Sequence, residues 1–132
     1  MANEEELNKL AYEAQYLQSQ LQEMQRQLQQ AASVGMQLDI TDKSIGQMLD
    51  LKDETYFQLG AGTFLLAKPS VENTVLIDIG AGVFLEKPFD EAREILKKRK
   101  TSVDKAIDAM KGNIEKLSKR LAELDLEASK YQ

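Results

Sequence analysis

The sequence contains no cysteine and no histidine. The chain therefore has no disulfide, no thiol redox centre, no Cys/His metal site and no Ser-His-Asp or Cys-His nucleophile pair. A carboxylate site for a hard cation would need a loop of alternating acidic ligands around a Gly turn, and the sequence has no such loop. We therefore expect a protein that is not an enzyme and that holds no metal and no cofactor.

Tryptophan is also absent, aromatic residues make up only 6%, and the chain has 2 Pro and 7 Gly in 132 residues. So few aromatic residues argue against a large globular core. Hydrophobic residues still make up 42% and charged residues 30%, and Leu, Ala, Glu, Lys and Gln crowd both ends, which is typical of long helices. We expect a single domain over residues 1–132, built mostly from helices with a different centre.

Targeting and membrane signals are missing as well. No apolar run approaches the roughly 20 residues that span a bilayer, and the acidic start, Met1 to Glu6, lacks the order of a signal peptide. The absence of cysteine fits a reducing compartment. These observations predict a cytoplasmic protein that does not contact membranes.

The net charge of −5 disfavours nucleic acid as a partner, because phosphate binding needs clustered Lys and Arg. One basic run stands out, Lys97-Lys98-Arg99-Lys100. It has two interpretations, a contact with nucleic acid or a solvated helix face, and the second is the more common. We expect no nucleic-acid partner.

Apolar residues near the N-terminus recur at alternating steps of three and four, which is a heptad seam. The seam runs through Leu7, Leu10, Ala14, Leu17, Leu21, Met24, Leu28 and Ala31. Gly35 takes the next seam position and weakens the helix there, but Leu38, Ile45 and Leu49 keep the register. We predict one helix over 3–51, with Thr41-Asp42 as an alternative start of a second helix.

The C-terminal end repeats this pattern over a predicted helix at 89–131. Its seam runs through Leu96, Val103, Ile107, Met110, Ile114, Leu117, Leu121, Leu124, Ala128 and Tyr131. The two helices have similar lengths, so the chain can fold back into an antiparallel coiled-coil hairpin whose two ends meet at one tip. Pairing between chains in a parallel coiled coil is the alternative.

The centre, residues 55–87, consists of four short runs rich in β-branched and aromatic residues, which predict strands. Gly60-Ala61-Gly62 separates the first two and Gly80-Ala81-Gly82 the last two. Gly60, Gly62, Gly80 and Gly82 supply the positive φ of tight turns, so we predict two β-hairpins in tandem. A phosphate-binding loop is a much weaker interpretation of these turns, because neither leads into a helix N-terminus or a Lys-Ser/Thr pair.

The hairpins also form an internal repeat. Residues 59–65 (Leu-Gly-Ala-Gly-Thr-Phe-Leu) align with residues 79–85 (Ile-Gly-Ala-Gly-Val-Phe-Leu), and each copy is followed by Lys-Pro. Two isolated hairpins are barely stable in water, and their free edges and apolar faces favour pairing with other chains. The sequence therefore predicts oligomerisation through the centre.

A helix, two hairpins that turn at Gly-Ala-Gly, and a second helix resemble the prefoldin alpha subunit over essentially the whole chain. The most specific segments are Leu59 to Phe64 and Val75 to Lys87, although Gln58 and Asp78 depart from the usual pattern. The resemblance implies an α+β, mostly α fold whose hairpins assemble into an oligomeric β-barrel platform. It further implies an α2β4 heterohexamer with prefoldin beta subunits, an ATP-independent holdase for unfolded polypeptides, and transfer of these clients to a group II chaperonin.

A holdase must expose apolar surface that its own fold does not use. We assign client binding to apolar residues at the predicted tip, both off the seam and in its last turns, namely Leu7, Leu10, Tyr12, Tyr16, Leu124, Leu126 and Tyr131. Single exposed apolar residues are also common without any function. We assign subunit assembly to strand residues, namely Leu59, Phe64, Leu66, Val75, Ile77, Ile79, Val83 and Phe84.

Two other classes of function remain as alternatives. A structural adaptor would bind one folded partner through the coiled coil, but it would not need the pair of hairpins. An enzyme would need proton-transfer groups in a pocket, and without His and Cys only scattered carboxylates are available.

Overall fold

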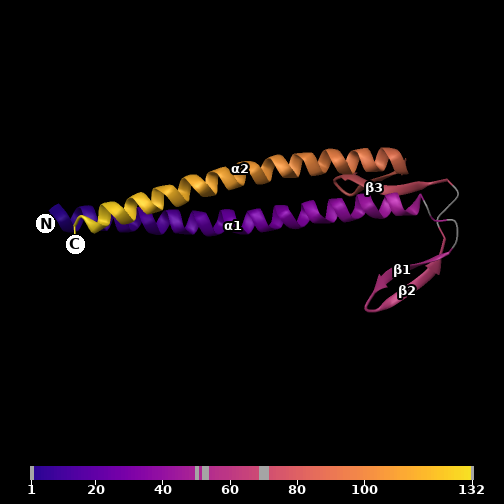
Figure 1. Ribbon diagram of the computed structural model, residues 1–132, viewed down its shortest axis with the longest axis horizontal. Coiled ribbons are helices and arrows are strands. Elements are labelled where there is room, and N and C mark those ends of the chain that lie inside the picture. Colours follow the sequence, from indigo (N-terminus) through magenta and orange to yellow (C-terminus); the bar gives the residue numbers. More distant parts are fainter. Residues whose placement is uncertain (1, 50, 52–53, 69–71, 132) are drawn as a thin grey trace. The chain divides into compact units, whose positions relative to one another are not determined.

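The computed structural model describes residues 2–49, 51, 54–68 and 72–131. The chain forms helix α1 (Ala2–Met48), strands β1 (Thr55–Gly60), β2 (Thr63–Ala67), β3 (Thr74–Gly80) and β4 (Val83–Pro88), and helix α2 (Phe89–Ser129), as Figure 1 shows. The predicted order of helix, two hairpins and helix is confirmed, and the fold is α+β with mostly helix.

Both helices end earlier than predicted. Helix α1 ends at Met48 and not at Leu51, whose N–H donates a 3.3 Å hydrogen bond to the carbonyl of Met48 in a final turn. Helix α2 ends at Ser129, and Tyr131 lies in a turn whose N–H bonds the carbonyl of Ala128. Such tightened last turns satisfy groups that the helix leaves unpaired.

Helix α1 passes Gly35 and Thr41 without a break. The Thr41 hydroxyl donates a 2.7 Å hydrogen bond to the carbonyl of Gln37, one turn earlier in the same helix. Thr41 is therefore an interior residue, and the alternative of a new helix starting at Thr41-Asp42 is wrong.

The chain divides into two compact units, which we describe separately. The terminal unit consists of residues 1–35 and 102–132, and the hairpin unit consists of residues 36–101. Each unit contains one part of α1 and one part of α2. Among the described residues, no helix is long and apolar enough to cross a membrane.

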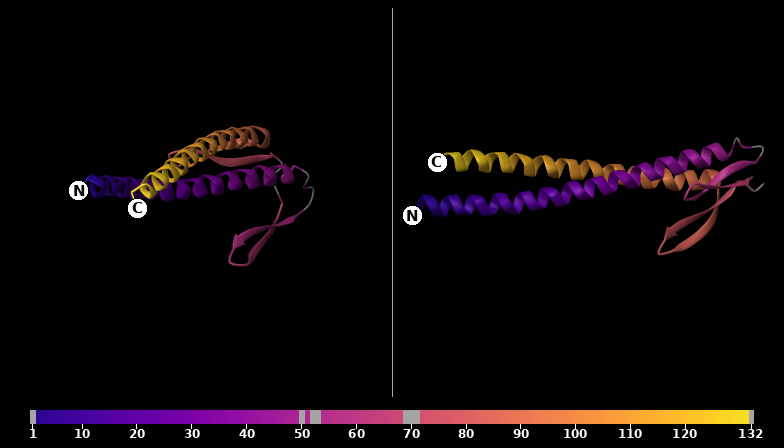
Figure 2. Two further views of the ribbon diagram at one scale, coloured as in Figure 1. Left: turned by 60° about the vertical axis from the view of Figure 1, so that its left-hand side comes forward. Right: turned by 90° about the horizontal axis from the view of Figure 1, so that it is seen from below.

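In the terminal unit the two helices lie side by side and antiparallel, with the N and C labels at the same end (Figures 1 and 2). The predicted seam is the buried line between them. Leu17 and Leu124 are buried, with Leu124 only 1% exposed, and the other seam residues from Leu7 to Ala31 and from Val103 to Ala128 are half-buried. The chain thus pairs its own helices, and the parallel alternative is wrong.

The hairpin unit contains a cluster of buried apolar residues, formed by Ile45, Ile77, Phe89, Ala92 and Leu96. Ile77 belongs to β3 and the other four to the helices, so one face of the β3–β4 hairpin packs on the helix pair. Full burial of a large apolar side chain contributes about 1.5–3 kcal/mol. This cluster therefore holds the second hairpin in place.

One seam position of α1 in this unit is charged. Asp42 accepts a 2.8 Å hydrogen bond from Arg93 Nε of α2, and this bond lowers the pKa of Asp42 below its ordinary value. A Cβ atom on Gly46 would lie 3.1 Å from Arg93 Nη1. Glycine at position 46 therefore leaves room for the guanidinium group that pairs with Asp42.

The strands form two separate two-stranded antiparallel sheets, β1–β2 and β3–β4. In each sheet the register shifts just before the turn, at Leu59 in the first and at Ile79 in the second. The turn residues have positive φ, with Ala61 at 48° and Gly62 at 72° in the first hairpin, and 52° and 73° at the matching positions of the second. Two central residues of this kind form a type I′ turn, which matches the twist of the strands.

Candidate functional site: outer apolar residues and hairpin faces

The predicted tip residues occupy three kinds of position in the terminal unit. Tyr12, Tyr16 and Leu126 are 75%, 62% and 66% exposed, and Tyr131 is exposed as well. Leu7 and Leu10 are half-buried in the seam. Leu124 is buried in a regular helical turn, so the seam is not frayed there, and Leu124 supports the tip from inside.

The three most exposed tip residues do not share one face. Tyr12 and Tyr16 are one helical turn apart on α1, and Tyr16 Oη accepts a 2.8 Å hydrogen bond from Gln20. Leu126 lies on α2. Because the outer positions of a heptad point away from the partner helix, the tyrosines form one apolar spot and Leu126 forms a second.

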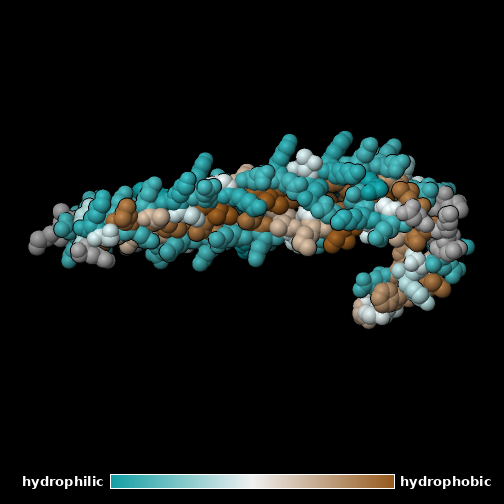
Figure 3. Space-filling model, in the orientation of Figure 1, coloured by the Kyte–Doolittle hydropathy of each residue, from teal (hydrophilic) through white to brown (hydrophobic). Residues whose placement is uncertain are grey.

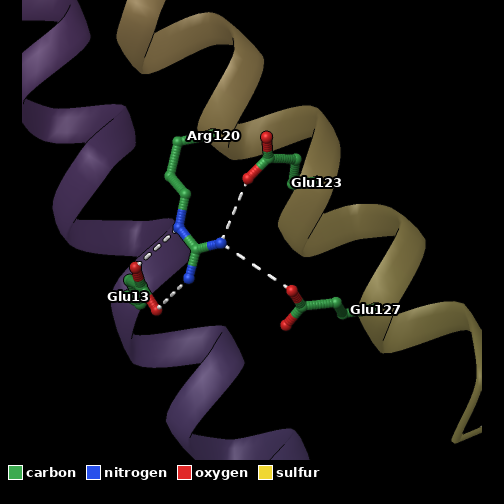
Figure 4. Close-up of polar contacts among 4 residues, drawn as sticks. All are labelled: Glu13, Arg120, Glu123 and Glu127. Carbon is green, nitrogen blue, oxygen red and sulfur yellow. Dashed lines mark hydrogen bonds and ion pairs between the residues drawn. The ribbon is translucent and has the colours of Figure 1, made fainter.

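Charged residues of the terminal unit are arranged around Arg120 (Figure 4). Arg120 Nε and Nη2 donate hydrogen bonds of 3.1 and 3.3 Å to the carboxylate of Glu13 on the other helix. Its Nη1 lies 3.2 Å from Glu123 Oε2 and 3.7 Å from Glu127 Oε1. The hydrogen bond with Glu13 is the main cause of a raised pKa of the Arg120 guanidinium. One arginine thus joins the two helices and faces three carboxylates, so this part of the terminal unit is acidic.

Most residues predicted for subunit assembly are exposed. Leu59, Phe64, Leu66, Ile79, Val83 and Phe84 all expose large apolar side chains. Val75 and Ile77 differ, because Ile77 is buried in the cluster with the helices and Val75 packs against it. These two residues stabilise the chain's own fold in the structure.

Other apolar residues, which the sequence patterns did not single out as site residues, are exposed as well. In the hairpins these are Tyr56, Leu65, Leu76 and Leu85, and on α1 they are Val34, Met36 and Ile40. The strand residues could have been found from the register, since Tyr56 pairs with Leu66 and Gln58 with Phe64 on one face of the first hairpin. The α1 residues could have been found from the heptad count, because all three lie off the seam.

The two hairpins differ in the charge of their surfaces. The β1–β2 hairpin, Thr55 to Ala67, has no charged residue and exposes Tyr56 and Phe64 on one face and Leu65 on the other. The β3–β4 hairpin packs one face on the helices and carries Asp78 and Glu86 on the other. The first hairpin therefore has two apolar faces to cover, and the second has one.

The basic run at 97–100 contacts groups of its own chain. Arg99 donates a hydrogen bond to the carbonyl of Asp78 in β3, and Lys100 Nζ lies 3.8 Å from Asp39 of α1. These contacts favour a structural role for Arg99 and Lys100. Within the described ranges, no group of three or more His, Cys, Asp or Glu residues is placed to hold a metal ion.

Comparisons with known proteins agree with this architecture. The family model for the prefoldin subunit matches residues 10–132. Prefoldin subunit alpha from Pyrococcus horikoshii is 31% identical over 133 residues, which cover 98% of this chain and 90% of that protein. Prefoldin subunit alpha from Methanosarcina barkeri is 28% identical over 135 residues, which cover 98% of this chain and 94% of that one.

A solved structure has the same fold. A chain in the cryo-EM structure of filamentous PFD from Methanocaldococcus jannaschii superimposes with a TM-score of 0.74 at 13% identity, covering 88% of this chain and 98% of that chain. The chain belongs to the prefoldin family, and its relatives place it with the alpha subunits.

Proposed function

We propose that this chain is the alpha subunit of an ATP-independent holdase that captures unfolded polypeptides at the tip of the helix pair. Membership of the prefoldin family supports a chaperone-type role. The observation that carries the finer proposal is the exposure of Tyr12, Tyr16 and Leu126 on outer faces of helices whose seam is already filled. Apolar side chains that the fold does not use are available to a client.

The hairpins provide the assembly surface in this proposal. Free strand edges tend to pair with other strands, and an isolated hairpin with exposed apolar faces is barely stable in water. The β1–β2 hairpin exposes apolar residues on both faces. We propose that Leu59, Phe64, Leu66, Ile79, Val83 and Phe84 contact prefoldin beta subunits in an α2β4 heterohexamer with a β-barrel platform. Val75 and Ile77 would contribute from inside, by holding the second hairpin on its helices.

The complex would then transfer the captured client to a group II chaperonin, without a catalytic step. Because unfolded chains leave the ribosome in the cytoplasm, we propose that the protein acts there.

Two measurements test this function. Native mass measurement of the chain alone and with a prefoldin beta subunit should show a complex with two copies of this chain and four of the other. The complex should then suppress aggregation of a denatured client, and the variant Tyr12→Ser/Tyr16→Ser/Leu126→Ser should suppress it much less. A variant complex that protects the client as well as the wild type does would refute the tip as the binding site, and a defined complex with one folded partner and no client protection would favour an adaptor.

A further inference from the structure

An uncharged line of residues runs along α1 in the terminal unit, one position C-terminal to each seam residue. We call it the amide line, and it consists of Asn8, Ala11, Gln15, Gln18, Gln22, Gln25, Gln29 and Ala32. All of these side chains are exposed. The matching line on α2 is mostly charged and consists of Asp104, Asp108, Lys111, Glu115, Ser118, Ala122, Asp125 and Ser129.

The glutamines of the amide line differ from other glutamines of the same helix. Gln20, on another face, donates to Tyr16 Oη at 2.8 Å, and Gln27 donates to Glu23 Oε1 at 3.3 Å. In the part of the chain that the structure describes, the side chains of Gln22, Gln25 and Gln29 make no such hydrogen bond within the protein. Their amide groups are therefore available to a ligand.

Open grooves lie along this line. One, of about 500 Å³, is lined by Gln22, Gln25, Arg26, Leu28 and Gln29. A second, of about 690 Å³, is lined by Leu28, Gln29 and Ala32 of α1 and by Asp104, Ile107, Asp108 and Lys111 of α2. The seam residues Leu28 and Ile107 give the second groove apolar lining, and Figure 3 shows apolar side chains in a band bordered by hydrophilic ones.

We propose that the amide line binds the main chain of an extended, unfolded client. This inference rests on the proposed function and assigns part of its substrate recognition to the shaft of the helix pair. A glutamine amide both donates and accepts hydrogen bonds, as does each peptide unit of an unfolded chain. Such contacts do not depend on the client's sequence. Because the line residues are uncharged, a client that binds to them does not have to desolvate a charged group.

The chemistry of the line, more than its spacing, fits an extended chain better than a helix. Successive line residues rise by about 5 Å along the helix axis, and an extended chain presents main-chain groups to one side about every 6.7 Å. Over the two steps from Gln22 to Gln29 the mismatch adds up to about 3 Å, which flexible glutamine side chains can bridge. A partner helix has already satisfied its own main-chain groups, so it would leave most of these amides without a main-chain partner. The apolar part of the second groove, at Leu28 and Ile107, can hold apolar side chains of the client.

The test compares two variants of the full chain, each assembled with a prefoldin beta subunit. The line variant is Gln25→Ala/Gln29→Ala, and the control is Gln27→Ala/Gln30→Ala, which spares Gln20 because it bonds Tyr16 of the tip. Each loses two amides from the same stretch of α1, and alanine favours the helix in both. The probe is a short, labelled peptide that stays unfolded, used unmodified and with N-methyl groups on every second residue, which removes main-chain donors.

We expect the line variant to bind the unmodified peptide about tenfold more weakly than the wild type, and the control to stay within about twofold. N-methylation should weaken binding to the wild type by a similar factor but have little effect on the line variant, because the two changes remove the same hydrogen bonds. Equal binding of the peptide by the line variant and the wild type, or an equal loss of affinity on N-methylation in both, would overturn this inference and leave the proposed function standing. A line variant that changes the mass of the complex would show that the line pairs helices, and a wild type that binds no unfolded peptide would overturn the proposed function itself.

Discussion

The same substitution, glycine to alanine, should have opposite effects at Gly82 and at Gly112. Apart from the neighbouring residues in the chain and the backbone of the same helical turn, a Cβ atom at either position would meet no atom within 4 Å. The added methyl group therefore causes no clash. The effect must come from the backbone. Gly82 has a φ of 73° in the second hairpin turn, whereas Gly112 lies inside helix α2.

Left-handed backbone costs a residue with a Cβ atom roughly 1–2 kcal/mol, so Gly82→Ala should destabilise the chain by about that amount. Glycine inside a helix costs about 1 kcal/mol relative to alanine, so Gly112→Ala should stabilise it by about 1 kcal/mol. Gly80 has a φ of 125°, where only glycine is comfortable, and Gly80→Ala should cost about 1–3 kcal/mol. Ala81→Asn, which places a residue that tolerates positive φ at 52°, should be stabilising.

The assay is urea unfolding followed by far-ultraviolet circular dichroism at one fixed protein concentration, because assembly contributes to stability. The midpoints should rank Gly112→Ala above the wild type and Gly82→Ala and Gly80→Ala below it, with similar slopes. A Gly82→Ala variant as stable as the wild type would refute the turn geometry. A Gly112→Ala variant that is less stable would refute an unobstructed helix at that position.

The remaining predictions concern the packing and charges of the two units. Ile77→Ala should destabilise the hairpin unit by about 2–5 kcal/mol, because it opens a cavity in the cluster of buried apolar residues, and urea unfolding measures this loss. Arg93 lowers the pKa of Asp42, so the stability from their pair is present above about pH 4 and lost as the pH falls through the lower folded pKa. The gap between the urea midpoints of the wild type and Asp42→Asn should therefore shrink on acidification, and a gap that does not change with pH would contradict the pairing. Glu13→Gln should lower thermal stability slightly at low salt and have no effect at about 1 M salt, where exposed ion pairs are screened.

Much of the fold could be predicted because the seam has a strict period. Every predicted seam residue from Leu7 to Ala31 is buried or half-buried in the structure, since a regular heptad leaves a helix pair one way to cover its apolar line. The turns were equally predictable, because a Gly-x-Gly sequence between β-branched runs has few alternatives to a tight hairpin. The repeat at 59–65 and 79–85 therefore gave two hairpins of the same geometry.

The roles of individual residues were harder to predict, because they depend on contacts between distant segments. The internal repeat aligns Phe57 with Ile77, yet only Ile77 is buried against the helices, and nothing in the repeat itself distinguishes the two. The ion pairs of Asp42 with Arg93 and of Glu13 with Arg120 join residues far apart in the sequence. The sequence alone also could not show that the tip residues lie on two different outer faces, because this depends on how the two helices pair.

Photo-crosslinking from defined positions tests most directly whether unfolded clients bind at the tip. A photoreactive side chain would replace Tyr12, Leu126 or, as a control on the outer shaft of α2, the exposed Lys116, in the complex with a prefoldin beta subunit. An unfolded client should crosslink efficiently from positions 12 and 126 and weakly from position 116. Equal crosslinking from all three positions, or crosslinking from position 116 alone, would contradict the account.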